Sequence, residues 1–262
     1  MLDEQPLPPS RLRPASLLTV LFALVLPALS RQLPSFPESA AWVVWWLPVI
    51  PLSLWHWQYR LHRRRFWLRH HMNPESRWYR LLQGGYLMLP WSVLRAVFLA
   101  AMLLAGVLAS TLSLCLIVLA PLLTGLAAHR LDRALMSALN PQALTLFSER
   151  SARWLALACL TALYALLSLF LPQPDYAGTD FSDAASQALY SAAAGSELVS
   201  LIQAADTLQT FLFHWSVQNL LQDDAGFWWL LGGWLSLLLK GAVFFLPAVE
   251  LSLAGQRWLA RR

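Results

Sequence analysis

The stretch RLHRRRFWLRHHMNPESRWYR, residues 60–80, separates two long apolar segments and decides how the rest of the chain is arranged. It contains seven arginines and one acidic residue, Glu75. Loops that stay in the cytoplasm collect Lys and Arg, so this stretch is expected on the cytoplasmic side of a membrane. Aromatic residues alternate with the arginines, which is typical of a segment lying along the inner membrane surface. The residues expected to contact lipid or a protein partner here are Arg60, Arg63, Arg64, Arg65, Phe66, Trp67, Arg69, Arg77, Trp78 and Arg80.

The overall composition excludes an ordinary soluble domain. Of the 262 residues, 58% are apolar and 13% are charged, and the mean hydropathy is +0.50. The net charge is +5, but the basic residues stand between apolar runs, so we expect contact with anionic membrane lipid and no direct nucleic acid binding. Cys115 and Cys159 each lie within an apolar segment and are predicted to be small buried residues. No cofactor is expected.

The N-terminal part predicts two membrane-spanning helices. Residues 1–14 are expected to form a cytoplasmic tail, and residues 15–30 form an apolar run that we interpret as a retained helix, with a signal peptide as the alternative. Residues 41–57 carry tryptophans at both ends, which marks the two interfaces of a second span. The basic loop that follows, residues 59–82, then leads into the next apolar run.

The central apolar run predicts a helical hairpin. Residues 81–128 contain one charge, Arg95, and are too long for one helix across about 30 Å of hydrocarbon but just long enough for two. The next loop, residues 129–153, is also basic, with Arg130 and Arg133 expected to contact lipid or a partner. Two cytoplasmic loops enclose an even number of crossings, so we expect a turn within residues 106–113. One long tilted helix is the alternative.

Residues 173–225 are expected on the exported side, after a fifth span that covers residues 154–171. They contain seven acidic residues and no Lys or Arg. Apolar residues recur at helical spacing within them and predict an amphipathic helix over residues 197–222, preceded by a helix of small residues over 183–194. The predicted interaction face of the amphipathic helix consists of Leu198, Ile202, Leu208, Leu212 and Trp215.

Residues 226–262 complete the predicted architecture with a last span and a cytoplasmic C-terminus. The fold class is therefore all-α: a multi-pass protein of the bacterial inner membrane with about six transmembrane helices and both termini cytoplasmic. Lys240 and Glu250 lie in the last span, and with Arg95 they are the intramembrane charges, candidates for ion or proton movement. For Arg95 we favour snorkelling to the inner headgroups over pairing, and for Glu250 a place at the inner interface.

The histidines do not form a pattern that predicts a metal site. His62, His70 and His71 lie among arginines, which oppose a divalent cation. His56 and His214 each stand alone beside aromatic residues, so we interpret them as interface residues. No reaction motif occurs in any span.

One region resembles a known family. Residues 120–133, APLLTGLAAHRLDR, followed by Ser148-Glu149-Arg150 and a new apolar segment, are similar to part of the inner-membrane proteins encoded in integrating conjugative elements near their coupling ATPase. The resemblance covers part of residues 95–172 and implies a setting in DNA-transfer machinery rather than a mechanism. Asn140-Pro141 stands where that family has a Gly-rich turn, and the exported segment falls later in this chain. The matching positions are Pro121, Leu122, Gly125, Leu126, Arg130, Asp132, Arg133 and Glu149.

These features predict a non-enzymatic scaffold or assembly subunit of a multiprotein machine, in conjugative DNA transfer or secretion. Its partners would be lipid and other membrane or cytoplasmic subunits. The alternative is a small transporter or channel subunit that uses Arg95, Lys240 and Glu250. A lipid-modifying enzyme is a third possibility, for which the sequence offers no catalytic motif.

Overall fold

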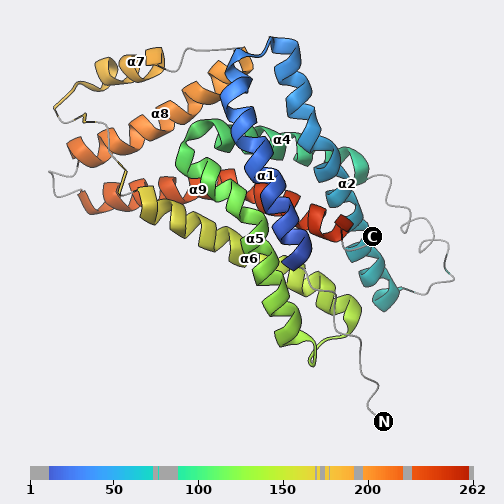
Figure 1. Cartoon of the computed structure of the whole chain (residues 1–262). Helices are drawn as coiled ribbons and strands as arrows, with labels where there is room; N and C mark the ends of the chain where they lie inside the picture. The colour runs from blue at the N-terminus through green and yellow to red at the C-terminus, as the bar shows by residue number, and fades with distance from the viewer. Residues whose placement is uncertain are drawn as a thin grey trace.

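The computed structural model describes residues 12–72, 76, 88–168, 170–171, 175–176, 178–191, 197–220 and 226–259, and in this part of the chain every regular element is a helix. Long helices cross one another in a bundle, and two further helices, α7 and α8, lie at one end (Figure 1). The tail at residues 1–11 and the predicted contact residues Arg77, Trp78 and Arg80 lie outside the described residues. The elements are α1 (Leu12–Gln32), η1 (Leu33–Ser35), α2 (Glu38–His71), α4 (Leu89–Ala109), α5 (Thr111–Leu135), α6 (Pro141–Ser168), α7 (Phe181–Ser191), α8 (Glu197–Leu220) and α9 (Gly226–Leu259).

Five of the described helices are long and apolar enough to cross a membrane: α1, α4, α5, α6 and α9. The chain is therefore a helical membrane protein. The 34-residue helix α2 includes the second predicted span but is not among the five. Its tryptophans, its prolines Pro48 and Pro51 and its C-terminal arginines make it less hydrophobic than the others. A count of six crossings therefore stays a prediction.

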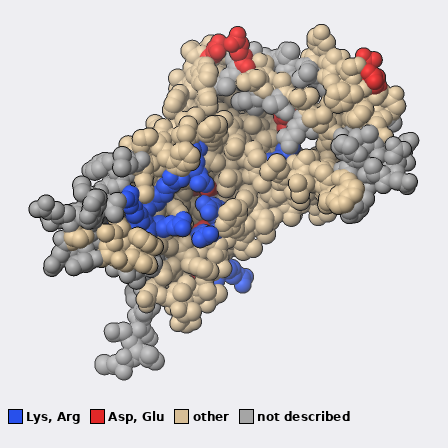
Figure 2. All heavy atoms as spheres, turned by 180° about the vertical axis from the view of Figure 1, so that it is seen from behind, with Lys and Arg blue, Asp and Glu red and all other residues tan. Residues whose placement is uncertain are grey.

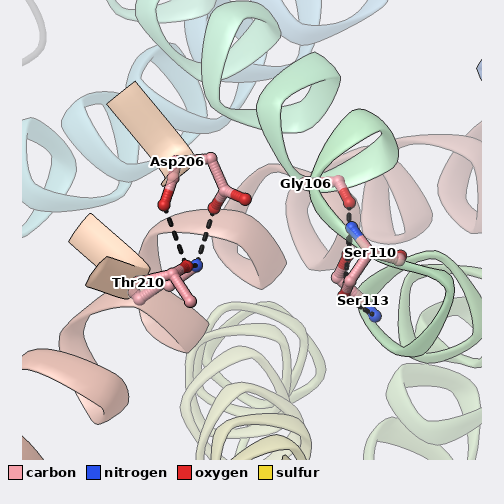
Figure 3. Close-up of polar contacts among 6 residues, drawn as sticks. Gly106, Ser110, Ser113, Asp206 and Thr210 are labelled. Atoms are coloured by element: carbon pink, nitrogen blue, oxygen red, sulfur yellow. Dashed lines mark hydrogen bonds and ion pairs between the residues drawn. The ribbon is translucent and has the colours of Figure 1, made fainter. Parts of the chain in front are cut away.

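The break between α4 and α5 falls within the predicted turn. Ser110 has an extended backbone (φ −158°, ψ 157°) and begins α5 with a capping box. Its hydroxyl accepts from the Ser113 N–H at 3.1 Å, and the Ser113 hydroxyl contacts the Gly106 carbonyl oxygen at 2.6 Å (Figure 3). These bonds satisfy backbone groups that the ends of both helices leave open. The central run is thus two helices, and the alternative of one long helix is wrong.

Helix α9 lies at the centre of the bundle and contacts α1, α2, α4, α5, α6 and α8. Its residues Phe245 and Val249 are fully buried, and they belong to one apolar core with Ile117 of α5 and Leu160 of α6. Packing is close at Gly106, where a Cβ atom would lie 2.9 Å from Ile117 Cδ1 and 3.0 Å from Phe244 Cβ. The glycine lets α4 approach α5 and α9.

The surface of the bundle corrects the prediction for the cysteines. Cys115 and Cys159 are both exposed on the outside of the helices. In a bilayer, the outer surface of a helix bundle is as apolar as its interior. An apolar neighbourhood in the sequence therefore does not distinguish a buried position from a lipid-facing one.

Helices α7 and α8 form a small unit of their own. Phe211 of α8 is almost fully buried, and Leu208, Trp215 and Tyr176 pack around it. The ring centroids of Phe181 and Trp215 are 5.1 Å apart. Leu208 and Trp215 therefore pack within the chain rather than presenting a free face, because α7 folds back onto α8. Of the predicted face, Leu212 is 42% exposed, whereas the side chains of Leu198 and Ile202 lie outside the described residues.

Candidate functional site

Glu250 of α9 is the centre of a buried ionic cluster at one end of the bundle. Its carboxylate is fully buried and meets basic side chains from three other helices. Glu250 Oε2 lies 2.7 Å from His56 Nε2 of α2, and Oε1 lies 2.9 Å from Arg95 Nη2 of α4 and 3.3 Å from Arg153 Nη1 of α6. A carboxylate can accept several hydrogen bonds, so one acid here neutralises groups on three helices.

This geometry corrects two expectations from the sequence. His56 does not stand alone, because it is 3% exposed and pairs with Glu250. Arg95 pairs with the same carboxylate instead of only snorkelling, although its side chain stays 36% exposed. Glu250 itself is fully buried among these side chains, and its place at the inner interface stays a prediction. A buried carboxylate is costly without partners, and these basic side chains are its partners.

Further arginines surround this cluster and stack on aromatic rings. The Arg257 guanidinium lies 5.4 Å from the Trp55 ring centroid, and Arg257 Nε is 3.6 Å from Glu149 Oε1. The Arg60 guanidinium lies 6.0 Å from the Trp91 ring centroid. Cations within about 6 Å of an aromatic face are attracted to it. Described Lys and Arg side chains gather on one part of the visible face, while Asp and Glu lie toward the opposite edges (Figure 2).

The predicted contact residues extend outward from this end. Arg63, Arg65 and Trp67 are exposed on the last turns of α2, and Arg64 is half-buried. Arg130 and Arg133 are exposed at the end of α5. The side chains of Phe66 and Arg69 lie outside the described residues. The predicted basic residues therefore form a rim around the buried Glu250 cluster.

A second ionic cluster lies near the middle of α9, at Lys240. Lys240 Nζ is 2.7 Å from Asp206 Oδ1 and donates to Thr210 Oγ1 at 2.7 Å. The Lys240 ammonium also lies 5.7 Å from the Phe244 ring centroid. The Lys240 and Asp206 side chains are only 8% and 15% exposed. Asp206 and Thr210 lie one turn apart on α8, close to the Ser110–Ser113 bend (Figure 3).

A cavity of about 300 Å³ opens beside Lys240. Its lining combines the ion pair with hydroxyl groups, an imidazole and aromatic rings. Burial, and to a lesser extent the charge of Lys240, lower the pKa of His214 below its ordinary value. The imidazole is therefore neutral at pH 7 and can both donate and accept a hydrogen bond. The polar and charged lining residues are Ser110, Tyr164, Ser168, Tyr176, Asp206, Thr207, Thr210, His214, Ser236 and Lys240.

The two clusters are separated along a single helix. Lys240 and Glu250 are ten residues apart, about 15 Å along α9, and they do not pair with each other, as the sequence predicted. Sequence reasoning missed His56, Arg153 and Asp206 as their partners. Arg153 was assigned to a cytoplasmic loop and Asp206 to an exported helix, and only the rarity of buried charges without a partner could have prompted a search for them. Among the described residues, no group of three or more His, Cys, Asp or Glu side chains could hold a metal ion.

The fold and the two clusters define a class, a multi-helix membrane protein with two separate sets of buried ion pairs along its central helix. No family model matches the chain, and no curated protein or solved structure is significantly similar to it.

Proposed function

We propose that this protein is a non-enzymatic scaffold subunit of a membrane-bound multiprotein assembly. The observation that carries the proposal is the continuity of α2 from Glu38 to His71. Its 34 residues correspond to about 51 Å, whereas the hydrocarbon of a bilayer is about 30 Å thick. The helix therefore anchors in the bundle through residues such as Leu52 and is long enough to carry its arginines past the hydrocarbon.

The exposed end of α2 suits an acidic partner. Arg63, Arg65 and Trp67 are exposed, and the Trp67 ring stacks on His71 with centroids 4.5 Å apart. No ion pair holds Arg63, Arg64 or Arg65 within the described part of the chain. Arginine and tryptophan are enriched where protein interfaces concentrate their binding energy. This end of α2 is accordingly our proposed docking element.

The proposed topology has six crossings, α2 included, with both termini in the cytoplasm of a bacterial cell and with α7 and α8 on the exported side. The contacts of the α1–α2 connection support it. Leu33 and Ala41 pack with Leu104, near the end of α4 that leads to the Ser110 bend, so the two turns that the topology places on the exported side lie on the same side of the bundle. A reporter fused at residue 140 tests this topology. Activity of an export-dependent reporter there would contradict it.

The biological setting that we propose is conjugative DNA transfer or secretion. It rests on the resemblance of residues 120–133 and on the need of such machines for membrane subunits that hold cytoplasmic and exported components together. The matching arginines Arg130 and Arg133 are exposed and belong to the same basic rim as α2.

The decisive experiment changes the docking element without changing the bundle. Arg63, Arg64 and Arg65 are replaced together by Glu in the full chain, and proteins that copurify from native membranes are compared with those of the wild type. Reversal of charge should remove the partners, because like charges across an interface cost several kcal/mol. Arg31→Glu, an exposed arginine at the end of α1, is the matched control. A C-terminal reporter must show that the topology is unchanged, and retention of the same partners by the triple variant would contradict the proposal.

The cavity beside Lys240 favours a second candidate function, a transporter or channel subunit. Buried ionisable side chains that line a cavity within a membrane protein are candidates for an ion or proton pathway. Lys240→Met combined with Asp206→Leu removes both charges together, so neither is left buried without its partner. Proton flux into proteoliposomes, followed with a pH-sensitive dye, tests this role. Wild-type flux that the double variant loses while its partners still copurify would replace the scaffold proposal.

A further inference from the structure

An apolar groove runs along the outside of the bundle between α1, α2 and α9, with a volume of about 480 Å³. Its walls include Leu21 of α1 and Ile50 and Leu54 of α2, which are 52%, 61% and 47% exposed. The groove is separate from the Lys240 cluster and adjoins the Glu250 cluster through Trp55 and Arg257. Because α1 and α9 are among the five apolar helices, it opens toward lipid rather than water.

One end of this groove is polar. Gln58 of α2 and Arg257 and Trp258 of α9 line it there. These residues lie at the same end of the bundle as the basic rim, since Arg257 follows Glu250 by seven residues. Trp258 is 56% exposed, and tryptophan is typical of the level of the lipid headgroups. The groove therefore runs from the hydrocarbon to the headgroup region.

Arg257 is held in a position suited to an anion. Its guanidinium lies over the Trp55 ring, and its Nε faces Glu149 at 3.6 Å. A guanidinium has five N–H donors in a planar fork, so an interaction at the Nε edge leaves other donors for a phosphate. The aromatic face below it fixes the orientation of the fork.

We propose that the groove holds one acyl chain of an anionic phospholipid, whose phosphate is bound by Arg257. A volume of about 480 Å³ corresponds to roughly sixteen groups of about 30 Å³, the size of a water molecule and close to that of a methylene. One acyl chain fills this space. A helix about 10 Å across would fill it with about one turn, so a partner helix fits it poorly.

The headgroup supplies the selectivity of this site. An acyl chain gains little by moving from the bilayer into an equally apolar groove, because no hydrophobic driving force separates the two environments. One arginine near the membrane surface favours an anionic lipid about fivefold. The site should therefore prefer phosphatidylglycerol over phosphatidylcholine with identical chains by about that factor.

Native mass spectrometry of the full chain in mild detergent tests the proposal. The protein is mixed with equal amounts of these two lipids and the bound lipid is counted. The wild type should retain one phosphatidylglycerol. Arg257→Gln should lower the preference to about one, and Ile50→Trp, which fills the groove, should lower retention of both lipids.

Two matched variants separate this site from the general lipid surface. Leu47→Trp places the same ring on α2 at an exposed position that does not line the groove, and Arg130→Gln removes an exposed arginine elsewhere on the rim. Both should bind lipid as the wild type does. Equal retention of the two lipids by the wild type, unchanged retention in Ile50→Trp, or an equal loss of preference in Arg130→Gln would each overturn the proposal.

Discussion

Replacing Glu250 with Gln tests whether one buried carboxylate holds four helices together. The substitution keeps the shape of the side chain and removes its charge. His56, Arg95 and Arg153 then face each other without the acid that lies 2.7, 2.9 and 3.3 Å from them. The expected result is a large loss of stability at this end of the bundle.

The size of this loss of stability follows from how exposed each partner of Glu250 is. Removing one member of a buried ion pair costs about 3–5 kcal/mol. Arg95 and Arg153 have 36% and 20% exposed side chains and can turn partly toward headgroups, which reduces the cost of leaving them without the acid. His56 is almost fully buried, but its imidazole can still hydrogen-bond to the amide that Glu250→Gln puts in place of the carboxylate. We therefore expect Glu250→Gln to lower the free energy of unfolding by about 3 kcal/mol, the lower end of that range.

The assay is the free energy of unfolding in mixed detergent micelles, measured by Trp fluorescence as the fraction of denaturing detergent is raised. Glu38→Gln, an exposed acid in the first turn of α2, is the control and should cost no more than about 1 kcal/mol. Adding Arg95→Gln to Glu250→Gln should restore roughly 1 kcal/mol, because one uncompensated charge is removed. A loss below about 1 kcal/mol for Glu250→Gln would refute the reasoning, since no ion pair worth that little holds helices in place.

Three further predictions use the same unfolding assay. Gly106→Ala should lower the free energy of unfolding by about 1 kcal/mol, since overpacking against Ile117 outweighs the gain in helix propensity. Gly232→Ala, whose Cβ meets no atom within 4 Å, should raise it by about the same amount. Equal effects of the two substitutions would contradict the packing argument. Ser113→Ala should cost about 1 kcal/mol through loss of the capping box at the α4–α5 break, and an unchanged stability would mean that water replaces the cap. The pKa of His214 is lowered in the folded state, so the unfolded chain binds the proton more readily and stability should fall as the pH drops below about 6.5. Unfolding free energies measured at about pH 7.5 and pH 5.5 check this. The fall between these two pH values should be smaller in His214→Gln.

The helical class and the main break were predictable from the sequence because they follow from local properties. Apolar runs of span length, punctuated by arginines, identify membrane helices. The turn within residues 106–113 followed from the length of the apolar run and from the basic loops on both sides of it, and Ser110 lies inside the turn. The extent of α2 was less predictable, because the span and the basic stretch were treated as separate elements although nothing between Trp57 and Arg60 ends a helix.

The partners of the buried charges were not predictable from the sequence. His56, Arg95 and Arg153 reach Glu250 only because α2, α4 and α6 pack at particular rotations around α9. An apolar helix in lipid has no polar face that would reveal its rotation. For the same reason the sequence placed Asp206 on an exported helix without a partner, although its carboxylate turns inward to Lys240.

The two clusters have opposite polarity, and this gives α9 a fixed position. At Glu250, α9 supplies the acid and its neighbours supply basic side chains; at Lys240, near the middle of the helix, α9 supplies the cation and α8 supplies the acid. Apolar packing in a bilayer distinguishes poorly between neighbouring registers of a helix. A shift of α9 by one turn, about 5.4 Å, would break the ion pairs of both clusters at once. Because α2 is tied to one cluster and α8 to the other, the same two sets of ion pairs fix where the basic end of α2 and the α7–α8 unit stand relative to each other. A scaffold requires a fixed spacing between the two surfaces that it presents. Fixing that spacing is a sufficient reason for the charges to be buried, and transport is not needed to explain them.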